Sequence, residues 1–273
     1  MDFDEPKLEE SKPSRRLKIY KDRIETTEQQ EAFERALNIT KQVEQTAAYR
    51  IADLFSHLSR STDIVDLNYE SLIDVFDRAR DLSDYTWEEL GELNIEFLTT
   101  FSNYVISVKS RENHTRDIIL PEIEEYHVLS SIEEEYEKKI AELGLDIHGY
   151  FFTSLRNYFV HEGIPETMMV LGDDDEPDSF SIPKEIIIES STFSTRAKGY
   201  VNSWEETVDL EEAVKAYHEA ADELYSWFFE YTEALYKDEY RVAELLDEEA
   251  RLYQEIFFNR CEVSFTKIQW AGG

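Results

Sequence analysis

Most of the chain shows the apolar periodicity of amphipathic helices. Between residues 27 and 60, large apolar residues recur every three or four positions, so their side chains share one helix face. Similar spacing follows Thr86, residue 130 and Asp209. A helix with a long apolar face draws most of its stability from packing against other helices. The pattern therefore predicts a mainly α-helical bundle of long antiparallel helices.

Local signals predict the boundaries of the first helices. We expect a break at residues 61–67, followed by a shorter helix that carries Leu72 and Phe76. Thr86, with Glu89 three residues later, has the spacing of a capping box and predicts a helix start. We therefore expect three successive helices in this part of the chain.

Glycine and proline mark the later helix ends. Gly144 is expected to interrupt the helix that begins near residue 130, and Gly163 followed by Pro165 to end it. The last long helix is expected to span residues 209–258, with a kink near Lys237.

A short segment between the helices has the pattern of β-strands. Residues 167–171 and 179–182 flank a polar turn at 172–178. This arrangement predicts a small β-hairpin around residues 167–183, inserted between bundle helices. The pattern leaves residues 185–204 open between strand and helix.

The first residues of the chain show neither pattern. Residues 1–16 are charged, contain Pro6 and Pro13 and have little apolar content, which predicts a flexible acidic arm. The rest, residues 17–273, is expected to form a single helical-bundle domain with residues 164–190 as the hairpin insertion.

The composition is that of a folded protein without disulfide bonds. The 273 residues are 41% hydrophobic and 13% aromatic, enough to bury a sizeable core. The single cysteine, Cys261, excludes an intrachain disulfide and fits a reducing compartment. The N-terminus lacks the regions of a secretory signal, and no run approaches the roughly 20 apolar residues of a membrane helix. We therefore expect a cytoplasmic protein that does not enter a membrane.

The chain is strongly acidic. Asp and Glu number 61 against 28 Lys and Arg, a formal net charge of -33. In molar salt the Debye length falls to about 3 Å, so such a surface no longer repels itself. An acidic decoy for a basic partner would concentrate its acidic residues, whereas here they are spread along the chain. The charge is therefore interpreted as halophilic adaptation.

Several common catalytic motifs are absent from the sequence. It has no glycine-rich phosphate loop, no G-x-S-x-G turn and no cysteine cluster for a metal. Glu124 and His127 form one Glu-x-x-His pair, but a di-iron bundle needs two such pairs and two more glutamates. We therefore expect no metal and no cofactor. Surface or core positions explain four further histidines: His57, His114, His148 and His218.

One stretch combines residues suited to phosphate chemistry. Arg156, Asn157 and His161 lie close together near a predicted helix end. An arginine fork matches phosphate oxygens, a histidine exchanges protons near neutral pH, and an asparagine both donates and accepts hydrogen bonds. Together they suffice for RNA cleavage without a metal, in which a base takes the 2′-hydroxyl proton and a cation stabilises the phosphate.

Helix geometry limits how these residues cooperate. On a straight helix Asn157 and His161 are roughly 40° apart, whereas Arg156 and His161 are roughly 140° apart. The helix must therefore loosen at its end, the long arginine must reach round it, or a second copy of the chain must complete the site. The last option makes a symmetric dimer the natural enzyme.

The order of these residues resembles a known motif. Arg156, the polar Asn157 and His161 five positions after the arginine are similar to the R-x4-6-H motif of the HEPN superfamily. The resemblance implies that Arg156 and His161 are catalytic and that Asn157 orients them. It also implies a metal-independent endoribonuclease that acts on RNA as a homodimer, in a toxin–antitoxin or defence system with an antitoxin partner.

Two alternatives remain open at this point. A non-catalytic helical interaction or scaffold protein would use the same bundle and bind a partner through its long final helix. A nucleotide-binding HEPN relative would keep the cleft but leave RNA intact. The motif also occurs in a looser form, as Arg50 with His57, where the apolar Ile51 follows the arginine.

Overall fold

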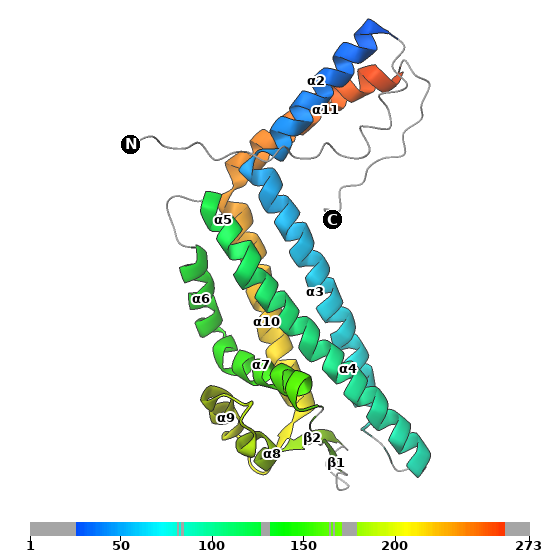
Figure 1. The fold of residues 1–273 in the computed structure, drawn as a ribbon, viewed down its shortest axis with the longest axis vertical. Coiled ribbons are helices and arrows are strands. Elements are labelled where there is room, and N and C mark those ends of the chain that lie inside the picture. The colour runs from blue at the N-terminus through cyan, green and yellow to red at the C-terminus, as the bar shows by residue number, and fades with distance from the viewer. Residues whose placement is uncertain are drawn as a thin grey trace. The chain divides into compact units, whose positions relative to one another are not determined.

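The computed structural model describes residues 26–80, 82, 85–126, 132–163, 165, 167–170 and 179–259 (Figure 1). The chain divides into two compact units. Unit 1 comprises Met1–Ala52 and Tyr236–Gly273, and unit 2 comprises Asp53–Leu235. The acidic arm expected at residues 1–16 lies outside the described residues.

Unit 1 contains two antiparallel helices, α2 (Thr27–Glu44) and α11 (Lys237–Asn259), which pack side by side (Figure 1). Arg35 Nη1 on α2 donates a hydrogen bond to Tyr253 Oη on α11 at 3.3 Å. Apolar residues buried along α2 supply its packing face: Ala32, Phe33, Ala36 and Val43.

The helix α3 (Ala47–Arg78) continues through residues 61–67, where the sequence predicts a break. That prediction is wrong, because the apolar face does not stop there. Leu58, Val65 and Leu72 are fully buried at seven-residue spacing and keep one side of the helix in the core. The polar residues between them occupy the other sides of the same helix.

The break between the first two helices comes earlier, at residues 45–46. The single helix predicted over residues 27–60 is therefore also wrong. Thr46 accounts for the interruption, because its Oγ1 donates to the Val43 carbonyl at 2.7 Å and accepts from Tyr49 N–H at 3.2 Å. A threonine that bonds the third N–H of the next helix starts that helix.

Unit 2 holds the other long helices. Thr86 forms the predicted capping box, because its Oγ1 accepts from Glu89 N–H at 3.3 Å and Glu89 Oε2 accepts from Thr86 N–H at 2.7 Å. Gly144, with φ of 68°, separates two helices as predicted. The elements after α3 are α4 (Trp87–His114), the π-helical turn η2 (Thr115–Ile119), α5 (Leu120–Tyr126), α6 (Ile132–Glu142), α7 (Leu145–His161), α8 (Lys184–Glu189), α9 (Thr195–Val201) and α10 (Leu210–Leu235).

Aromatic side chains join α10 to its neighbours in unit 2. The Phe228 ring lies 5.3 Å from that of Phe55 on α3 and 5.3 Å from that of Tyr136 on α6. One end of α10 packs on α7, where the rings of Tyr217 and Phe152 are 4.6 Å apart. All five residues are buried. The core of unit 2 therefore follows the length of α10.

A small antiparallel sheet confirms the predicted hairpin and extends it. Strand β1 (Met168–Val170) pairs with β2 (Ser179–Pro183), and β2 pairs with β3 (Thr207–Asp209), giving the order β1-β2-β3. The pattern did not indicate β3, because three residues are too few for a periodicity. Helices α8 and α9 occupy most of residues 185–204, the segment that the sequence left open.

The mainly α-helical fold with a small β insertion is confirmed. Within it, the helix predicted over residues 209–258 is two helices, α10 and α11, separated at Tyr236. The predicted kink near Lys237 thus lies next to the actual interruption. In the part of the chain that the structure describes, no helix combines the length and apolar character needed to cross a membrane.

We predict that the ring stack between α4 and β2 contributes strongly to stability. Phe97 is fully buried, and its ring lies parallel to that of Phe180 at 3.8 Å. Phe97→Ala should lower the free energy of unfolding by about 3–5 kcal/mol through the cavity it leaves. Ile95→Ala, on the exposed face of α4, should change it by less than about 0.5 kcal/mol. Denaturant titration in molar KCl measures both values, and equal losses would contradict the packing assignment.

Candidate functional site

The three residues of the sequence motif lie at the C-terminal end of α7. Arg156 and Asn157 are half-buried, and His161 is exposed as the last residue of the helix. Arg156 Nη1 donates a hydrogen bond to Asn157 Oδ1 at 3.2 Å. Within the described residues, Arg156 forms no ion pair with a carboxylate. In a chain with 61 acidic residues, this leaves the arginine's positive charge without an anionic partner there.

The end of α7 is defined by local backbone geometry. Glu162 and Gly163 both donate their N–H to the Tyr158 carbonyl, at 2.8 and 3.1 Å. Gly163 has φ of 104°, a conformation that residues with a Cβ rarely adopt. The helix therefore stops directly after His161, as the sequence predicts.

The segment between α8 and α9 holds this helix end in place. Glu162 accepts hydrogen bonds from Ser190 Oγ, at 3.2 Å, and from Thr192 Oγ1. Ser194 N–H donates to Ser154 Oγ in the middle of α7 at 3.3 Å. The residues that follow the hairpin thus fix the orientation of the α7 C-terminus.

One face of α7 continues from this contact to the motif. Tyr150, Ser154, Asn157 and His161 fall within about 60° on a helical projection. Arg196 of α9 donates a hydrogen bond to Tyr150 Oη, and its guanidinium carbon lies 4.7 Å from the Tyr150 ring centre. Arg196 therefore adds a second positive charge on the face that carries Asn157 and His161.

The structure does not bring Arg156 and His161 into direct contact within one chain. Helix α7 is regular through His161, so it does not loosen before the histidine. No hydrogen bond joins the two side chains among the described residues. The sequence leaves three arrangements open, and the regular helix excludes a loosened end. Either the long Arg156 side chain extends round the helix toward His161, or a second copy of the chain completes the site.

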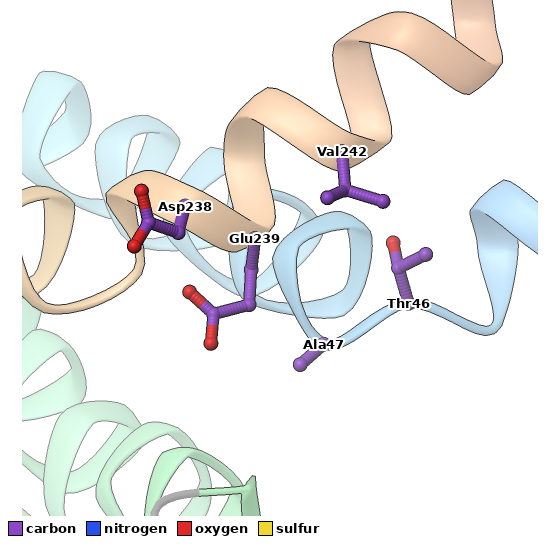
Figure 2. Close-up of a pocket in the computed structure, with 5 residues that line it drawn as sticks. All are labelled: Thr46, Ala47, Asp238, Glu239 and Val242. Carbon is purple, nitrogen blue, oxygen red and sulfur yellow. The ribbon is translucent and has the colours of Figure 1, made fainter.

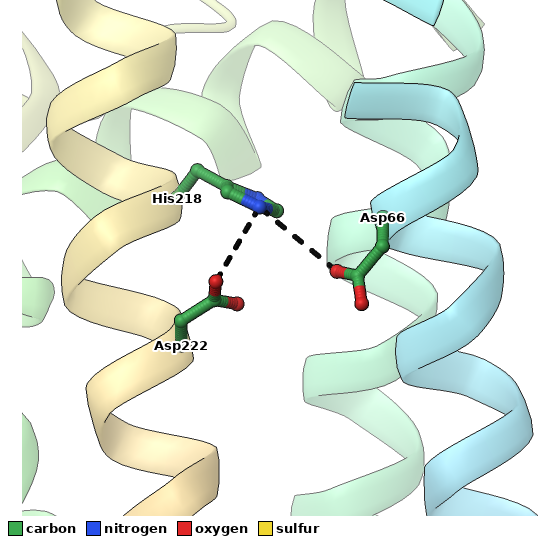
Figure 3. Close-up of side chains that lie close together, drawn as sticks. All are labelled: Asp66, His218 and Asp222. Carbon is green, nitrogen blue, oxygen red and sulfur yellow. Dashed lines mark ion pairs between the residues drawn. The ribbon is translucent and has the colours of Figure 1, made fainter. Parts of the chain in front are cut away.

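A second polar group, which the sequence does not indicate, lies between α3 and α10 (Figure 3). His218 Nε2 on α10 is 3.6 Å from Asp222 Oδ2 and 3.9 Å from Asp66 Oδ1 on α3. The Tyr69 ring stacks on the imidazole with 3.6 Å between ring centres. His218 is only 7% exposed, whereas the side chains of Asp66 and Asp222 are 45% and 52% exposed.

The environment perturbs all three ionisable groups. Burial raises the pKa of Asp66, and the neighbouring Asp222 charge raises it further. Burial also raises the pKa of Asp222 and lowers that of His218. The imidazole is thereby kept in its neutral form beside two carboxylates that repel each other.

Further polar atoms without hydrogen bonds lie in the same layer of the core. Arg111 on α4 is fully buried, and its guanidinium carbon lies 4.1 Å from the Tyr225 ring centre. Its three nitrogens, the Tyr104 hydroxyl and His218 Nδ1 have no hydrogen-bond partner among the described residues. The charge of Arg111 acts on Asp66, Asp222 and His218.

Sequence reasoning missed this group for identifiable reasons. Asp66 falls in residues 61–67, where a helix break is predicted, and it is far from His218 in the chain. The sequence does show that His218 and Asp222 are one helical turn apart, a spacing that places two side chains next to each other on a helix. The Glu124–His127 pair cannot be placed, because His127 lies outside the described residues.

Unit 1 contains a pocket at the junction of α2 and α3, beside the start of α11 (Figure 2). Its lining residues are Thr46, Ala47, Asp238, Glu239 and Val242. The lining has two carboxylates, and its hydroxyl, Thr46 Oγ1, already caps α3. This pocket offers no group for phosphate chemistry.

The chain matches no protein-family model and is significantly similar to no curated protein and to no solved structure. Functional assignment therefore rests on the chemistry of the two residue groups above.

We predict opposite stability changes for two glycines around α7. Gly163→Ala forces a Cβ onto φ of 104° and should lower the free energy of unfolding by about 1–2 kcal/mol. Gly149→Ala lies inside the helix with open space around it and should raise that energy by about 0.5–1 kcal/mol. Denaturant unfolding compares the two variants, and changes of the same sign would contradict the assigned helix end.

Proposed function

We propose that this protein is a HEPN-like, metal-independent endoribonuclease adapted to high salt, of the kind that serves toxin–antitoxin or defence systems. The observation that carries the proposal is the state of Arg156. Asn157 holds its guanidinium at 3.2 Å, no carboxylate among the described residues neutralises it, and the exposed His161 ends the same helix.

In the proposed reaction, His161 acts as the general base and Arg156 stabilises the charged phosphate. His161 takes the proton from a ribose 2′-hydroxyl, whose oxygen attacks the adjacent phosphorus. The bond from phosphorus to the 5′-oxygen breaks, this oxygen takes a proton from water, and the protonated His161 returns its proton to the solvent. The products carry a 2′,3′-cyclic phosphate and a 5′-hydroxyl. Asn157 positions Arg156 through their hydrogen bond.

The acidic surface is compatible with an RNA substrate when salt is high. Attraction between basic proteins and phosphates depends on counterion release, which weakens as salt rises. Repulsion between acidic groups and RNA is screened by the same salt. Arg156 and Arg196 then supply local positive charge along α7.

We predict that the motif residues are required for RNA cleavage. In molar KCl with EDTA, the wild-type chain should cleave cellular RNA, and His161→Ala and Arg156→Ala should each lose at least about a hundredfold in rate. Asn157→Ala should lose less, because it removes positioning and not a reacting group. Gel analysis of the RNA and detection of cyclic phosphate ends measure the outcome.

The looser copy of the motif provides a matched control. His57 is exposed on α3, and its Nε2 lies 4.0 Å from Asp53 Oδ2. His57→Ala therefore removes an exposed imidazole, as His161→Ala does. This variant should cleave RNA at the wild-type rate. The ribonuclease proposal is lost if wild type, His57→Ala and His161→Ala all behave alike.

We predict that a dimer completes the cleft, with Arg156 of one subunit and His161 of the other. Mixing inactive Arg156→Ala and His161→Ala chains should then restore about a quarter of the wild-type activity. After random exchange, half of the dimers contain one chain of each variant. Each such dimer has two clefts, and one of them keeps both Arg156 and His161. Sedimentation analysis checks the dimer. If a mixture with proven subunit exchange stays inactive, each chain must build its own site.

One observation favours the scaffold alternative. Helix α11 exposes Val242, Leu245 and Leu252, which are 53%, 60% and 57% exposed and lie near one face of the helix. A partner helix would cover such a face. In that case the chain would leave RNA intact under all conditions above, and mutation of His161 would not alter its interactions.

A further inference from the structure

We propose that Asp66, His218 and Asp222 form a binding site for one divalent transition-metal ion, with Zn²⁺ as the representative, between α3 and α10 (Figure 3). The site lies within unit 2 and is independent of the ribonuclease motif, whose chemistry needs no metal. One imidazole nitrogen and two carboxylate oxygens would bind the ion.

The distances suit a common centre. The three ligand atoms all lie within 4.8 Å of one another, and His218 Nε2 is 3.6 and 3.9 Å from the two carboxylates. An ion about 2.0–2.2 Å from each ligand in tetrahedral geometry requires separations of about 3.3–3.6 Å between the ligand atoms. A small rotation of each half-exposed carboxylate closes this difference, while stacking on Tyr69 keeps the imidazole in place.

The unbound arrangement leaves its polar groups poorly satisfied. His218 is buried, yet neither ring nitrogen forms a hydrogen bond among the described residues, since Nδ1 has no partner and Nε2 is beyond hydrogen-bond distance of both carboxylates. Buried polar groups in folded proteins are normally bonded. Two carboxylates facing one imidazole nitrogen also repel each other. A cation between them relieves the repulsion and gives Nε2 a partner.

Arg111 decides between a cation and an anion as the occupant. Its buried guanidinium could attract an anion, but such an anion would meet the negative charges of Asp66 and Asp222. The two carboxylates outweigh the single arginine, so the local charge favours a cation. Arg111 reduces the affinity for that cation without reversing the preference.

The three ligand atoms restrict which metal ions can bind. One nitrogen and two oxygens suit Zn²⁺, Co²⁺, Mn²⁺ or Fe²⁺, whereas Mg²⁺ and Ca²⁺ prefer oxygen ligands throughout. Both aspartates reach solvent, and His218 forms the buried base of the site. A bound ion would keep an open coordination position toward water, as catalytic zinc sites do.

We predict that the full-length chain, stripped with EDTA and dialysed into molar KCl, binds about one equivalent of Co²⁺ with visible d–d absorption bands. These bands report direct ligation, so weak association with surface carboxylates does not produce them. Zn²⁺ should displace the Co²⁺ and raise the unfolding temperature. Asp222→Asn and Asp66→Asn should each weaken binding at least about tenfold, and His218→Asn should abolish it.

The matched control is Asp53→Asn. Asp53 and His57 form another Asp–His pair one turn apart on α3, but both side chains are exposed. This variant should bind Co²⁺ like the wild type. The proposal is overturned if the wild type shows no saturable band, or if the band persists in both Asp66→Asn and Asp222→Asn. It is also overturned if Asp53→Asn loses the band equally.

Circular dichroism separates loss of the site from loss of the fold. Asp66 and Asp222 are half-exposed, so their amide variants should keep the helical spectrum of the wild type. If His218→Asn unfolds, the two aspartate variants alone decide the question. RNA cleavage in EDTA tests the ribonuclease proposal separately, so either proposal can fail without the other.

Discussion

The packing of aromatic rings along α10 is the constraint on which unit 2 depends. Phe228 lies against rings of α3 and α6, and Tyr217 packs on Phe152 of α7. Isolated helices of this kind are marginal in water, so packing of their apolar faces on α10 contributes to their stability. Aromatic pairs also prefer defined angles and distances, which restricts how the helices rotate about their axes.

The same core includes a polar layer that packing does not explain. Arg111, Tyr104 and His218 are buried, and their side chains contain polar atoms without hydrogen-bond partners among the described residues. An apolar layer of similar volume would avoid the desolvation cost of these groups. A cation bound by Asp66, His218 and Asp222 would offset this cost for His218 alone, because its Nε2 would gain a partner. The π-helical turn Thr115–Ile119 begins one turn after Arg111, and such turns often occur beside functional sites.

The two candidate sites use α10 in different ways. At the metal site, α10 supplies two of the three ligands directly, His218 and Asp222. At the end of α7 the role of α10 is indirect, because the contact of Tyr217 with Phe152 positions α7, whose end carries Arg156 and His161. The segment between α8 and α9 completes that positioning through Glu162 and Ser154.

The sequence by itself determined the helical class, the hairpin and several helix ends, whereas the predicted helices over residues 27–60 and 209–258 each proved to be interrupted. The features that it determined depend on local periodicity and on short-range bonds, such as the capping box of Thr86 and the backbone of Gly163. It also determined which residues form the motif at the end of α7, since they are neighbours in the chain. It erred at residues 61–67, because Ser, Thr and Asp resemble a turn there until Val65 is seen buried in the core. Only the tertiary structure brought Asp66 to His218, because the packing of α10 on α3 decides which polar residues of two distant helices face each other.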